Sequence, residues 1–375
     1  MSLTAAKKIP ATPHTTANLR VSQFTALVSP AELAAKLPID DYASTVVERG
    51  RDQVRAIMNG LDDRLLVVVG PCSIHDTEAG LEYARRLAEV ATEHQADLLI
   101  VMRAYFEKPR TTVGWKGLIN DPGLDGSHDV ARGLELARSF LLEVARLGVP
   151  TGTEFLEPIS PQYTADLISW GAIGARTAES QIHRQLSSGL SMPVGFKNGT
   201  DGGLQVALDA CNAALAAQSF LGIDADGRAA LVSTSGNLDA HIILRGGRDA
   251  PNYRSADVAQ ATAAATTAGV NPRLIIDASH ANSGKSHHRQ AQVALEIGAQ
   301  LEAGDASAHT IAGVMLESFL VGGAQNLNVE QIAAGGSELV YGQSVTDACM
   351  DWEVTAEVLA KLAYASSARR TEKRG

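Results

Sequence analysis

From Leu65 onward the chain alternates between short apolar runs and longer stretches in which apolar residues recur every three or four positions. The apolar runs predict eight strands, at 65–69, 98–102, 150–156, 172–175, 193–196, 241–244, 273–277 and 311–316. A helical pattern or a long loop follows each run, as in EAGLEYARRLAEVA after the first. Strands that alternate with helices imply a parallel sheet. Eight such units predict a closed (β/α)8 barrel, with an open doubly wound sheet as the alternative.

Two helices are predicted before the first strand. Ser29 can act as the N-cap of the first, Pro30 occupies its first position and Glu32 completes a capping box. A second helix is predicted over about 41–59 and stops at Gly60.

A further irregularity lies between the fifth and sixth strands. In FLGIDADGRAALV, residues 220–232, the Asp226-Gly227 pair separates two apolar runs and predicts a β-hairpin inserted before strand 6. We therefore divide the chain into a disordered arm (1–20), an N-terminal extension (21–60) and a barrel (61–370) with its hairpin insertion at about 220–235.

Composition and charge argue against a nucleic-acid-binding, membrane-spanning, secreted or disulfide-rich protein. Hydrophobic residues make up 45% of the chain and aromatic residues 5%, so small aliphatic side chains do most of the packing. A net charge of −10 argues against a nucleic-acid-binding face. No apolar run approaches the ~18 residues that span a membrane, and the N-terminus lacks the hydrophobic region of a secretory signal. Three widely spaced cysteines argue against a disulfide framework and favour a reducing cytoplasm.

Polar residues recur where the predicted strands end. They are Cys72, Arg103, Glu154, Arg176, Lys197, Arg245, His280 and Glu317. In a parallel barrel these ends all lie on the carboxyl-terminal face, where active sites are assembled. A single charged residue at a strand end usually just marks where the strand reaches solvent. Eight polar residues around one rim predict a functional site.

One group of these residues suits a metal ion. Cys72, His280, Glu317 and also Asp347 in SVTDAC offer one soft, one borderline and two hard ligands. Such a mixture favours a divalent transition metal over magnesium or calcium. The spacing is not that of a local metal motif, and each residue alone has a simpler interpretation. Cys72 could be a small packed residue or a nucleophile, and His280 a helix cap.

A second group is cationic and predicts anionic substrates. It contains Arg103, Lys108, Arg110, Arg176, Lys197 and Arg245. Guanidinium groups match phosphate and carboxylate groups, so a phosphorylated, doubly anionic substrate is the natural inference. The long stretch EKPRTTVGWKGLINDPGLDGSH after the second strand predicts a loop that folds over the ligand with Trp115 and Lys116. The basic tail ARRTEKRG is predicted to be frayed and solvated.

Several long motifs carry a family resemblance. GPCSIHD, VMRAYFEKPRTTVGWKGLINDP, PVGFKNGTDG, HIILRGG, D-SHANS-K and YGQSVTDAC together closely resemble type I 3-deoxy-D-arabino-heptulosonate 7-phosphate (DAHP) synthase, in its microbial form regulated by aromatic amino acids. The similarity runs from about Val21 to the C-terminus. It implies a TIM barrel that carries out the first step of the shikimate pathway, a metal-dependent, aldol-like condensation of phosphoenolpyruvate with erythrose 4-phosphate that releases inorganic phosphate.

The resemblance implies a role for each rim residue. Cys72, His280, Glu317 and Asp347 would bind the metal, with manganese favoured over iron, cobalt and zinc, so that Cys72 is a ligand rather than a nucleophile. The phosphoenolpyruvate site would comprise Arg103, Lys108, Arg176, Lys197 and Arg245, with backbone N–H groups near Gly174 and Ala175. The erythrose 4-phosphate site would comprise Lys108, Arg110 and Thr111. Lys108 would also be the general acid at the aldehyde oxygen, with a pKa tuned by neighbouring cations.

The resemblance also implies regulation. Family members are inhibited by phenylalanine, tyrosine or tryptophan in a cavity beside the barrel, built partly from a neighbouring subunit's N-terminal arm. The positions that map there are Pro161, Gln162, Leu186, Leu190, Ser191 and Phe220. General likeness favours tyrosine over phenylalanine and tryptophan. The expected assembly is a homo-oligomer, a dimer or a tetramer, in which residues 21–60 serve regulation and oligomerisation.

Three other functions compete. Another phosphoenolpyruvate-condensing barrel could use arabinose 5-phosphate or N-acetylmannosamine, but the KPRTTVGWKG loop argues against both. An aldolase could form an imine on Lys197 and would then be indifferent to chelators. A catalytically silent barrel could serve as a regulatory subunit, against which the complete set of metal and phosphate residues weighs.

Overall fold

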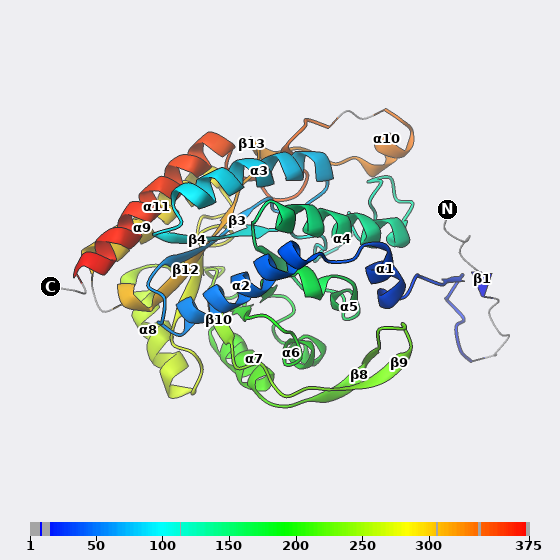
Figure 1. Ribbon diagram of the computed structural model, residues 1–375, viewed down its shortest axis with the longest axis horizontal. Coiled ribbons are helices and arrows are strands. Elements are labelled where there is room, and N and C mark those ends of the chain that lie inside the picture. The colour runs from blue at the N-terminus through cyan, green and yellow to red at the C-terminus, as the bar shows by residue number, and fades with distance from the viewer. Residues whose placement is uncertain (1–7, 10–15, 113, 305–306, 337–338, 373–375) are drawn as a thin grey trace.

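The described part of the chain folds into a closed barrel of eight parallel strands (Figure 1). The computed structural model describes residues 8–9, 16–112, 114–304, 307–336 and 339–372. In barrel order the strands are β3 (Leu65–Gly70), β4 (Leu98–Arg103), β5 (Thr151–Glu154), β6 (Trp170–Ile173), β7 (Val194–Lys197), β10 (Ala240–Leu244), β11 (Leu274–Asp277) and β12 (Ile311–Glu317). β12 pairs with β3 and closes the ring. The predicted (β/α)8 barrel is confirmed, and the open sheet is excluded.

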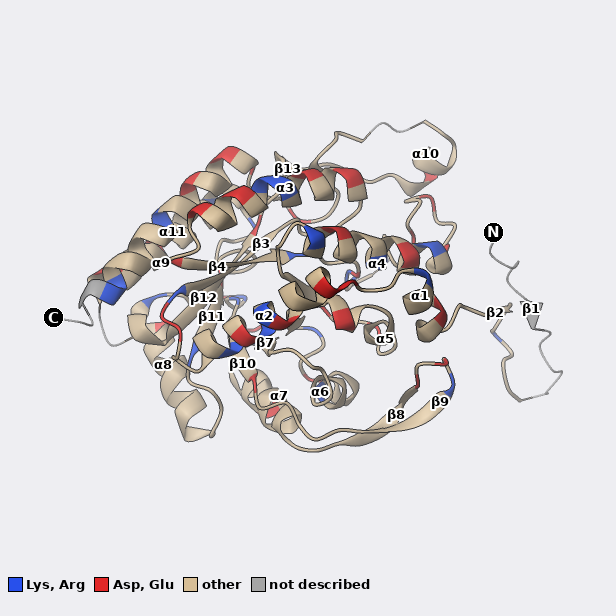
Figure 2. Ribbon diagram, viewed as in Figure 1, with Lys and Arg blue, Asp and Glu red and all other residues tan. Residues whose placement is uncertain are grey.

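Helices surround the barrel (Figure 1). They are α3 (Thr77–Glu93), α4 (Val130–Arg146), α5 (Pro161–Thr164) with η1 (Ala165–Leu167), α6 (Gln181–Ser187), α7 (Gln205–Leu215), α8 (Ser255–Thr267), α9 (His287–Ala303) after which comes η2 (Ala308–Thr310), and α11 (Trp352–Glu372). Between β12 and α11 lie β13 (Val321–Ala324), α10 (Val329–Ala333) and β14 (Gln343–Ser344). Figure 2 shows acidic residues along outward helices such as α3 and α11. None of the described helices is long and apolar enough to cross a membrane.

The barrel strands are apolar on both faces because both faces are covered. Every residue of β3, β4 and β12 is buried. A separate cluster fills the barrel interior and includes Leu66, Leu99, Ile243 and Ile275. Val54, Ile57 and Met58 at the end of α2 (Asp41–Met58) belong to the same cluster, so this N-terminal helix closes one end of the barrel. The other end is left open for polar residues.

One strand begins earlier than its apolar run predicted. The sequence indicated 172–175, but β6 spans Trp170–Ile173. Trp170 is fully buried inside the barrel, where its indole Nε1 donates to His241 Nε2 at 3.1 Å. The backbone of Trp170 pairs with Gly152 of β5, so β6 begins there and Gly174 and Ala175 lie beyond its end.

The N-terminal helices begin and end as predicted. The Ser29–Glu32 capping box opens α1 (Pro30–Lys36), and Gly60 just after α2 has a left-handed φ of 71°. Ahead of them β1 (Lys8–Ile9) pairs with β2 (Phe24–Thr25). The rest of the predicted disordered arm up to residue 15 lies outside the described residues, so its disorder stays a prediction.

The predicted hairpin is confirmed as β8 (Ser219–Ile223) and β9 (Ala229–Ser233), which pair antiparallel. It extends from the barrel toward α1 (Figure 1). At its tip Ala31 N donates to Ala225 O at 2.8 Å. The hairpin therefore contacts the N-terminal extension.

The prediction of a frayed basic tail is wrong at its start. Arg369 on α11 is 4% exposed, and its guanidinium donates to the carbonyl oxygens of Asp63, Ala308 and Ile311. Asp63 and Ala308 lie just before β3 and β12, and Ile311 is the first residue of β12, so Arg369 fixes the last helix to the amino-terminal end of the barrel. Their convergence depends on the closed ring and has no local sequence signal.

Candidate active site

A cavity of about 340 Å³ opens at the carboxyl-terminal end of the barrel. It brings together eleven of the residues singled out from the sequence, namely Lys108, Arg110, Thr111, Glu154, Gly174, Ala175, Arg176, Lys197, Arg245, His280 and Asp347. Pro109, Thr200, Lys285 and Thr346 complete its described lining. Cys72, Arg103 and Glu317 are buried beside it.

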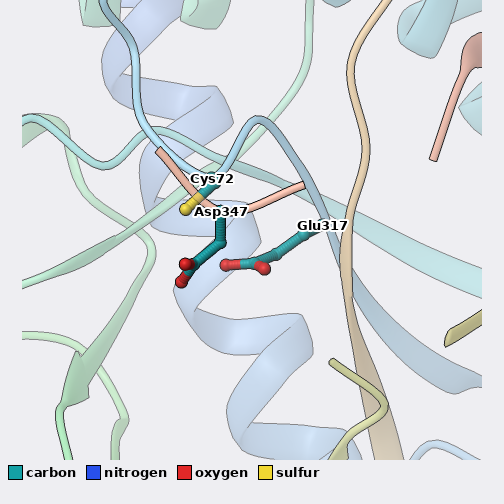
Figure 3. Close-up of side chains that lie close together, drawn as sticks. All are labelled: Cys72, Glu317 and Asp347. Carbon is teal, nitrogen blue, oxygen red and sulfur yellow. The ribbon is translucent and has the colours of Figure 1, made fainter. Parts of the chain in front are cut away.

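Three of the predicted metal ligands converge (Figure 3). One donor atom each of Cys72, Glu317 and Asp347 lies within 4.8 Å of the other two. The fourth, His280, places Nε2 4.0 Å from Glu317 Oε1. Sulfur, nitrogen and carboxylate oxygen donors at these separations fit a divalent transition metal, because magnesium and calcium prefer oxygen ligands alone.

The barrel register and one docked loop produce this convergence. Glu317 at the end of β12 pairs in register with Gly70, two residues before Cys72. The loop that carries Asp347 is held against both strands, since Met350 N donates to Glu317 O at 3.0 Å and Cys72 N to Cys349 Sγ at 3.4 Å. Residues 277 positions apart in the chain thereby become neighbours.

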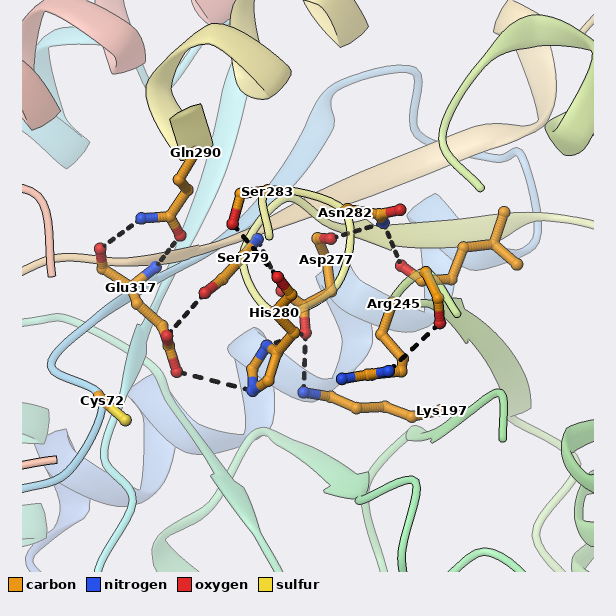
Figure 4. A network of polar contacts seen from close by, with 12 residues as sticks. Cys72, Lys197, Arg245, Asp277, Ser279, His280, Asn282, Ser283, Gln290 and Glu317 are labelled. Atoms are coloured by element: carbon orange, nitrogen blue, oxygen red, sulfur yellow. Dashed lines mark hydrogen bonds and ion pairs between the residues drawn. The ribbon is translucent and has the colours of Figure 1, made fainter. Parts of the chain in front are cut away.

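Asp277 is a site residue that sequence reasoning missed. Its Oδ2 lies 2.8 Å from Lys197 Nζ and 2.8 Å from His280 Nδ1, the latter without the angle of a hydrogen bond (Figure 4). Burial alone would raise the pKa of this carboxyl, but His280 and Lys197 outweigh it and hold the pKa well below the usual range. Asp277 therefore positions two predicted site residues. The only sequence signal was a carboxylate ending the apolar run RLIID.

Glu317 is held rigidly by its neighbours. Ser279 Oγ donates to its Oε2 at 2.7 Å, and Gln290 bonds both its backbone N–H and its backbone carbonyl (Figure 4). Its Oε1 accepts from Arg103 at 3.2 Å. Burial would raise the pKa of Glu317, but His280 and Arg103 lower it, so the carboxylate is charged and oriented as a ligand must be.

Arg103 is a fully buried cation. Its guanidinium stacks 3.8 Å from the centre of the Tyr105 ring. Burial would lower the pKa of Arg103, but Tyr105, Glu317 and Cys72 raise it. The side chain thus stays charged beneath the cavity.

Lys108 corrects one expectation. Its Nζ lies 3.1 Å from both Cys72 Sγ and Cys72 O. Burial would lower the pKa of Lys108, but Cys72 and Glu317 outweigh it and raise the pKa. Neighbouring anions rather than neighbouring cations therefore set its charge. The sequence shows which residues are cationic. It does not show which charged groups contact Lys108 in the folded protein.

Glu154 ends β5 and, among the described residues, is the one carboxylate besides Asp347 that lines the cavity. It is 6% exposed, and Oε1 has no hydrogen-bond partner among the described residues. A Cβ at Gly174 would lie 2.3 Å from that oxygen, so the present position of the Glu154 carboxylate leaves room only for glycine there. An unpaired acceptor in a cationic cavity is suited to hold a hydroxyl group or a water molecule.

The loop after β4 covers the site less than predicted. Of the loop residues that the structure describes, only the first ones, Lys108 to Thr111, line the cavity. Trp115 instead packs in the protein core at 4% exposure, with its indole N–H donating to Asp121 O at 2.7 Å. The aromatic residue thus anchors the loop rather than covering a ligand.

The positions mapped to an effector site lie outside this cavity. Pro161 and Gln162 are on α5, Leu186 is on α6, Leu190 and Ser191 follow α6, and Phe220 is on β8. Pro161 and Leu186 are buried, Leu190 and Phe220 are half-buried, and Gln162 and Ser191 are exposed. The effector role of these positions stays a prediction.

Glu107, next to Lys108, gives a pH-dependent prediction. Ser160 Oγ donates to its carboxylate at 2.8 Å and Glu157 N at 3.2 Å, but burial dominates and raises the pKa of Glu107 from 4.5 to about 7. The folded state then holds this proton more tightly than the unfolded state. Stability from Glu107 is present below pH 4.5 and is lost as the pH rises to about 7.

As the pH rises from 4.5 to 7, the free energy of unfolding should fall less for Glu107→Gln than for the wild type. The two falls should differ by at most about 3 kcal/mol. Urea unfolding across this window measures the difference. The exposed Glu89→Gln is the control and should follow the wild type. Parallel curves for Glu107→Gln and the wild type would show that the carboxyl is not perturbed.

Comparisons with known proteins agree with one another. The sequence profile of the DAHP synthetase I family matches residues 37–360. The phospho-2-dehydro-3-deoxyheptonate aldolase of Corynebacterium glutamicum is 54% identical over 356 residues, which cover 95% of this chain and 96% of that protein. Two such aldolases of Escherichia coli, named Trp-sensitive and Phe-sensitive, are 50% and 51% identical; each alignment covers 94% of this chain, and 99% and 98% of those proteins. The structure of the Francisella tularensis aldolase aligns with a TM-score of 0.89 at 45% identity, covering 93% of this chain and 99% of that one.

Proposed function

Because this chain belongs to the DAHP synthetase I family, we propose that its cavity condenses phosphoenolpyruvate with erythrose 4-phosphate to give DAHP and inorganic phosphate. The family makes the chain an enzyme, a 3-deoxy-7-phosphoheptulonate synthase of the shikimate pathway. The observation that carries the proposal is that metal-binding side chains and cationic side chains lie together at one cavity. Four metal-donor side chains stand beside a ring of cations suited to two phosphorylated substrates.

A divalent metal would be held by Cys72, His280, Glu317 and Asp347, with manganese favoured over iron, cobalt and zinc. Bound there, it would act as a Lewis acid toward the aldehyde of erythrose 4-phosphate. The protein supplies the ligands in a fixed arrangement, since Asp277 orients His280 and Ser279 orients Glu317. A thiolate among the ligands disfavours magnesium.

Cationic side chains would bind and align the substrates. Arg176, Lys197 and Arg245 line the cavity near Gly174 and Ala175, where they can hold the phosphate and carboxylate of phosphoenolpyruvate above Arg103. Arg110 and Thr111 lie on the segment after β4 and would hold the phosphate of erythrose 4-phosphate. Lys108 lines the same cavity and stays protonated, which suits a proton donor at the aldehyde oxygen.

Glu154 would hold the water that adds to C2. The bond from C3 of phosphoenolpyruvate to the aldehyde carbon forms first, and water oxygen must then bond to C2 before the C–O bond to phosphate breaks. Glu154 Oε1 is an unpaired acceptor at the cavity wall and can accept a hydrogen bond from that water. In this role it orients the water and takes up its proton.

The proposal includes feedback inhibition by an aromatic amino acid at Pro161, Gln162, Leu186, Leu190, Ser191 and Phe220. Relatives named Trp-sensitive and Phe-sensitive are almost equally similar, so overall identity does not select the effector. Tyrosine stays the favoured one from the sequence. Exposed apolar side chains on the N-terminal extension, among them Val21, Phe24 and Leu27, support a homo-oligomer, a dimer or a tetramer. Three free, buried cysteines support a cytoplasmic location.

The test is phosphate release from phosphoenolpyruvate by purified protein. We expect release only with erythrose 4-phosphate, loss after chelation, return on adding manganese, and inhibition by one of tyrosine, phenylalanine and tryptophan. Arabinose 5-phosphate and N-acetylmannosamine serve as control aldoses. No release with any aldose would contradict the proposal and support a silent subunit.

Release that survives chelation, with trapping by borohydride, would favour the imine mechanism on Lys197. The geometry weighs against it because Lys197 Nζ is engaged in a buried ion pair with Asp277. An imine would require that amine to be free.

A further inference from the structure

The turn after β11 has left-handed backbone where glycine is usual. His280 has a φ of 53° and Lys285 a φ of 64°, and Gly284 between them has a φ of 60°. This region is disfavoured for residues with a long side chain, because Cβ approaches the following carbonyl oxygen. Glycine or asparagine would take the position of Lys285 with less strain.

Hydrogen bonds fix this turn in place. Lys285 N donates to His280 O at 2.7 Å, which closes the turn. Asn282 Nδ2 donates to Asp277 O at 2.8 Å and to Leu244 O at 3.2 Å, which ties the turn to β11 and β10 (Figure 4). The backbone of Lys285 is therefore held rigidly, and its side chain lines the active-site cavity.

Lys285 lies on the same side of the cavity as Arg245. β10 and β11 are adjacent strands, and Arg245 follows the first while the turn follows the second. The two loops touch, since Asn252 N donates to Asn282 Oδ1 at 2.8 Å and a Cβ at Gly246 would lie 2.7 Å from Asn282 N. By contrast, Arg110 and Thr111 follow β4, which pairs with neither strand.

The Lys285 ammonium has no partner among the described residues, and its side chain is exposed. Arg245 stands on its side of the cavity, and Arg176 lies near Arg245, since burial and then the charge of Arg176 lower the pKa of Arg245. The backbone strain at Lys285 is explained if its unpaired ammonium group binds an anionic ligand in the cavity. We propose that Lys285 binds the phosphoryl group of phosphoenolpyruvate, as a third cation beside Arg176 and Arg245. This inference rests on the proposed function.

Three substitutions test it. Lys285→Met removes the charge, Lys285→Arg keeps it, and Lys285→Gly removes both the charge and the strain. In the manganese-loaded enzyme we expect Lys285→Met to raise the KM for phosphoenolpyruvate, and its Kd by calorimetric titration, about tenfold, with the KM for erythrose 4-phosphate unchanged. Lys285→Arg should restore most of the affinity. Lys361→Met, on the outer helix α11, is the matched control and should bind as the wild type does.

Lys285→Gly separates function from folding. It should weaken phosphoenolpyruvate binding as Lys285→Met does while raising the thermal midpoint by about 2 °C, because glycine relieves the left-handed strain. A residue with a purely structural role would not show higher stability together with weaker binding.

The outcomes that overturn the inference are distinct from those that overturn the proposed function. If Lys285→Met binds phosphoenolpyruvate like the wild type, or if only the KM for erythrose 4-phosphate rises, Lys285 does not hold this phosphoryl group. If the wild type itself shows no binding of phosphoenolpyruvate, the proposed function fails.

Discussion

Replacing Cys72 with serine is expected to lower kcat by about a thousandfold and to abolish retention of the metal. In the proposed donor set Cys72 is the soft ligand and would bind the metal as a thiolate, whereas a serine hydroxyl stays protonated and binds manganese or iron weakly. A Lewis acid contributes several kcal/mol to such a reaction, which corresponds to about three decades of rate. Metal content of the purified variant and phosphate release under saturating manganese are the two measurements.

Cys211→Ser is the matched control. Cys211 is equally buried but lies on α7, outside the cavity. It should keep its metal and its kcat, at a modest loss of stability from burying a hydroxyl group. A Cys72→Ser enzyme that keeps both metal and rate would show that Cys72 is only a packed residue, which is the simpler interpretation its sequence context allowed.

Replacing Asp277 with asparagine is expected to lower kcat at least a hundredfold and to destabilise the protein by about 3 kcal/mol. The carboxylate pairs with Lys197, contacts His280 Nδ1 and accepts from Ser279 N at 3.0 Å. An amide has one oxygen acceptor and no charge, so Lys197, which is 4% exposed, would be left as a buried cation without its partner.

Two measurements separate these effects. Urea unfolding at pH 7 reports the lost ion pair, and kcat under conditions where the variant remains folded reports the misplaced His280 and Lys197. Asp201→Asn changes an exposed carboxylate that follows β7 and should alter stability by less than about 0.5 kcal/mol. An active, stable Asp277→Asn enzyme would mean that Asp277 orients neither side chain.

The sequence by itself determined the barrel strands, the two N-terminal helices, the hairpin and most of the rim. The eight apolar runs predicted eight strands correctly. A strand of a parallel barrel is buried on both faces, so its sequence is a continuous run of apolar residues. The start of α1 at Ser29 and the hairpin at Asp226-Gly227 could also be predicted, because caps and turns depend on a few adjacent residues. Polar residues such as Arg245 and His280 could be placed on one rim because all parallel strands of a barrel end on the same face.

Contacts between distant residues could be decided only by the tertiary structure. The roles of Asp277 and Glu154, the anchoring of Trp115 and the burial of Arg369 each depend on partners from other strands or loops. The charge of Lys108 is an example with chemical consequences, because the sequence offered many cations but only the folded barrel places Cys72 and Glu317 beside it. Local pattern specifies where a side chain emerges from the barrel, and closure of the ring decides which groups it meets.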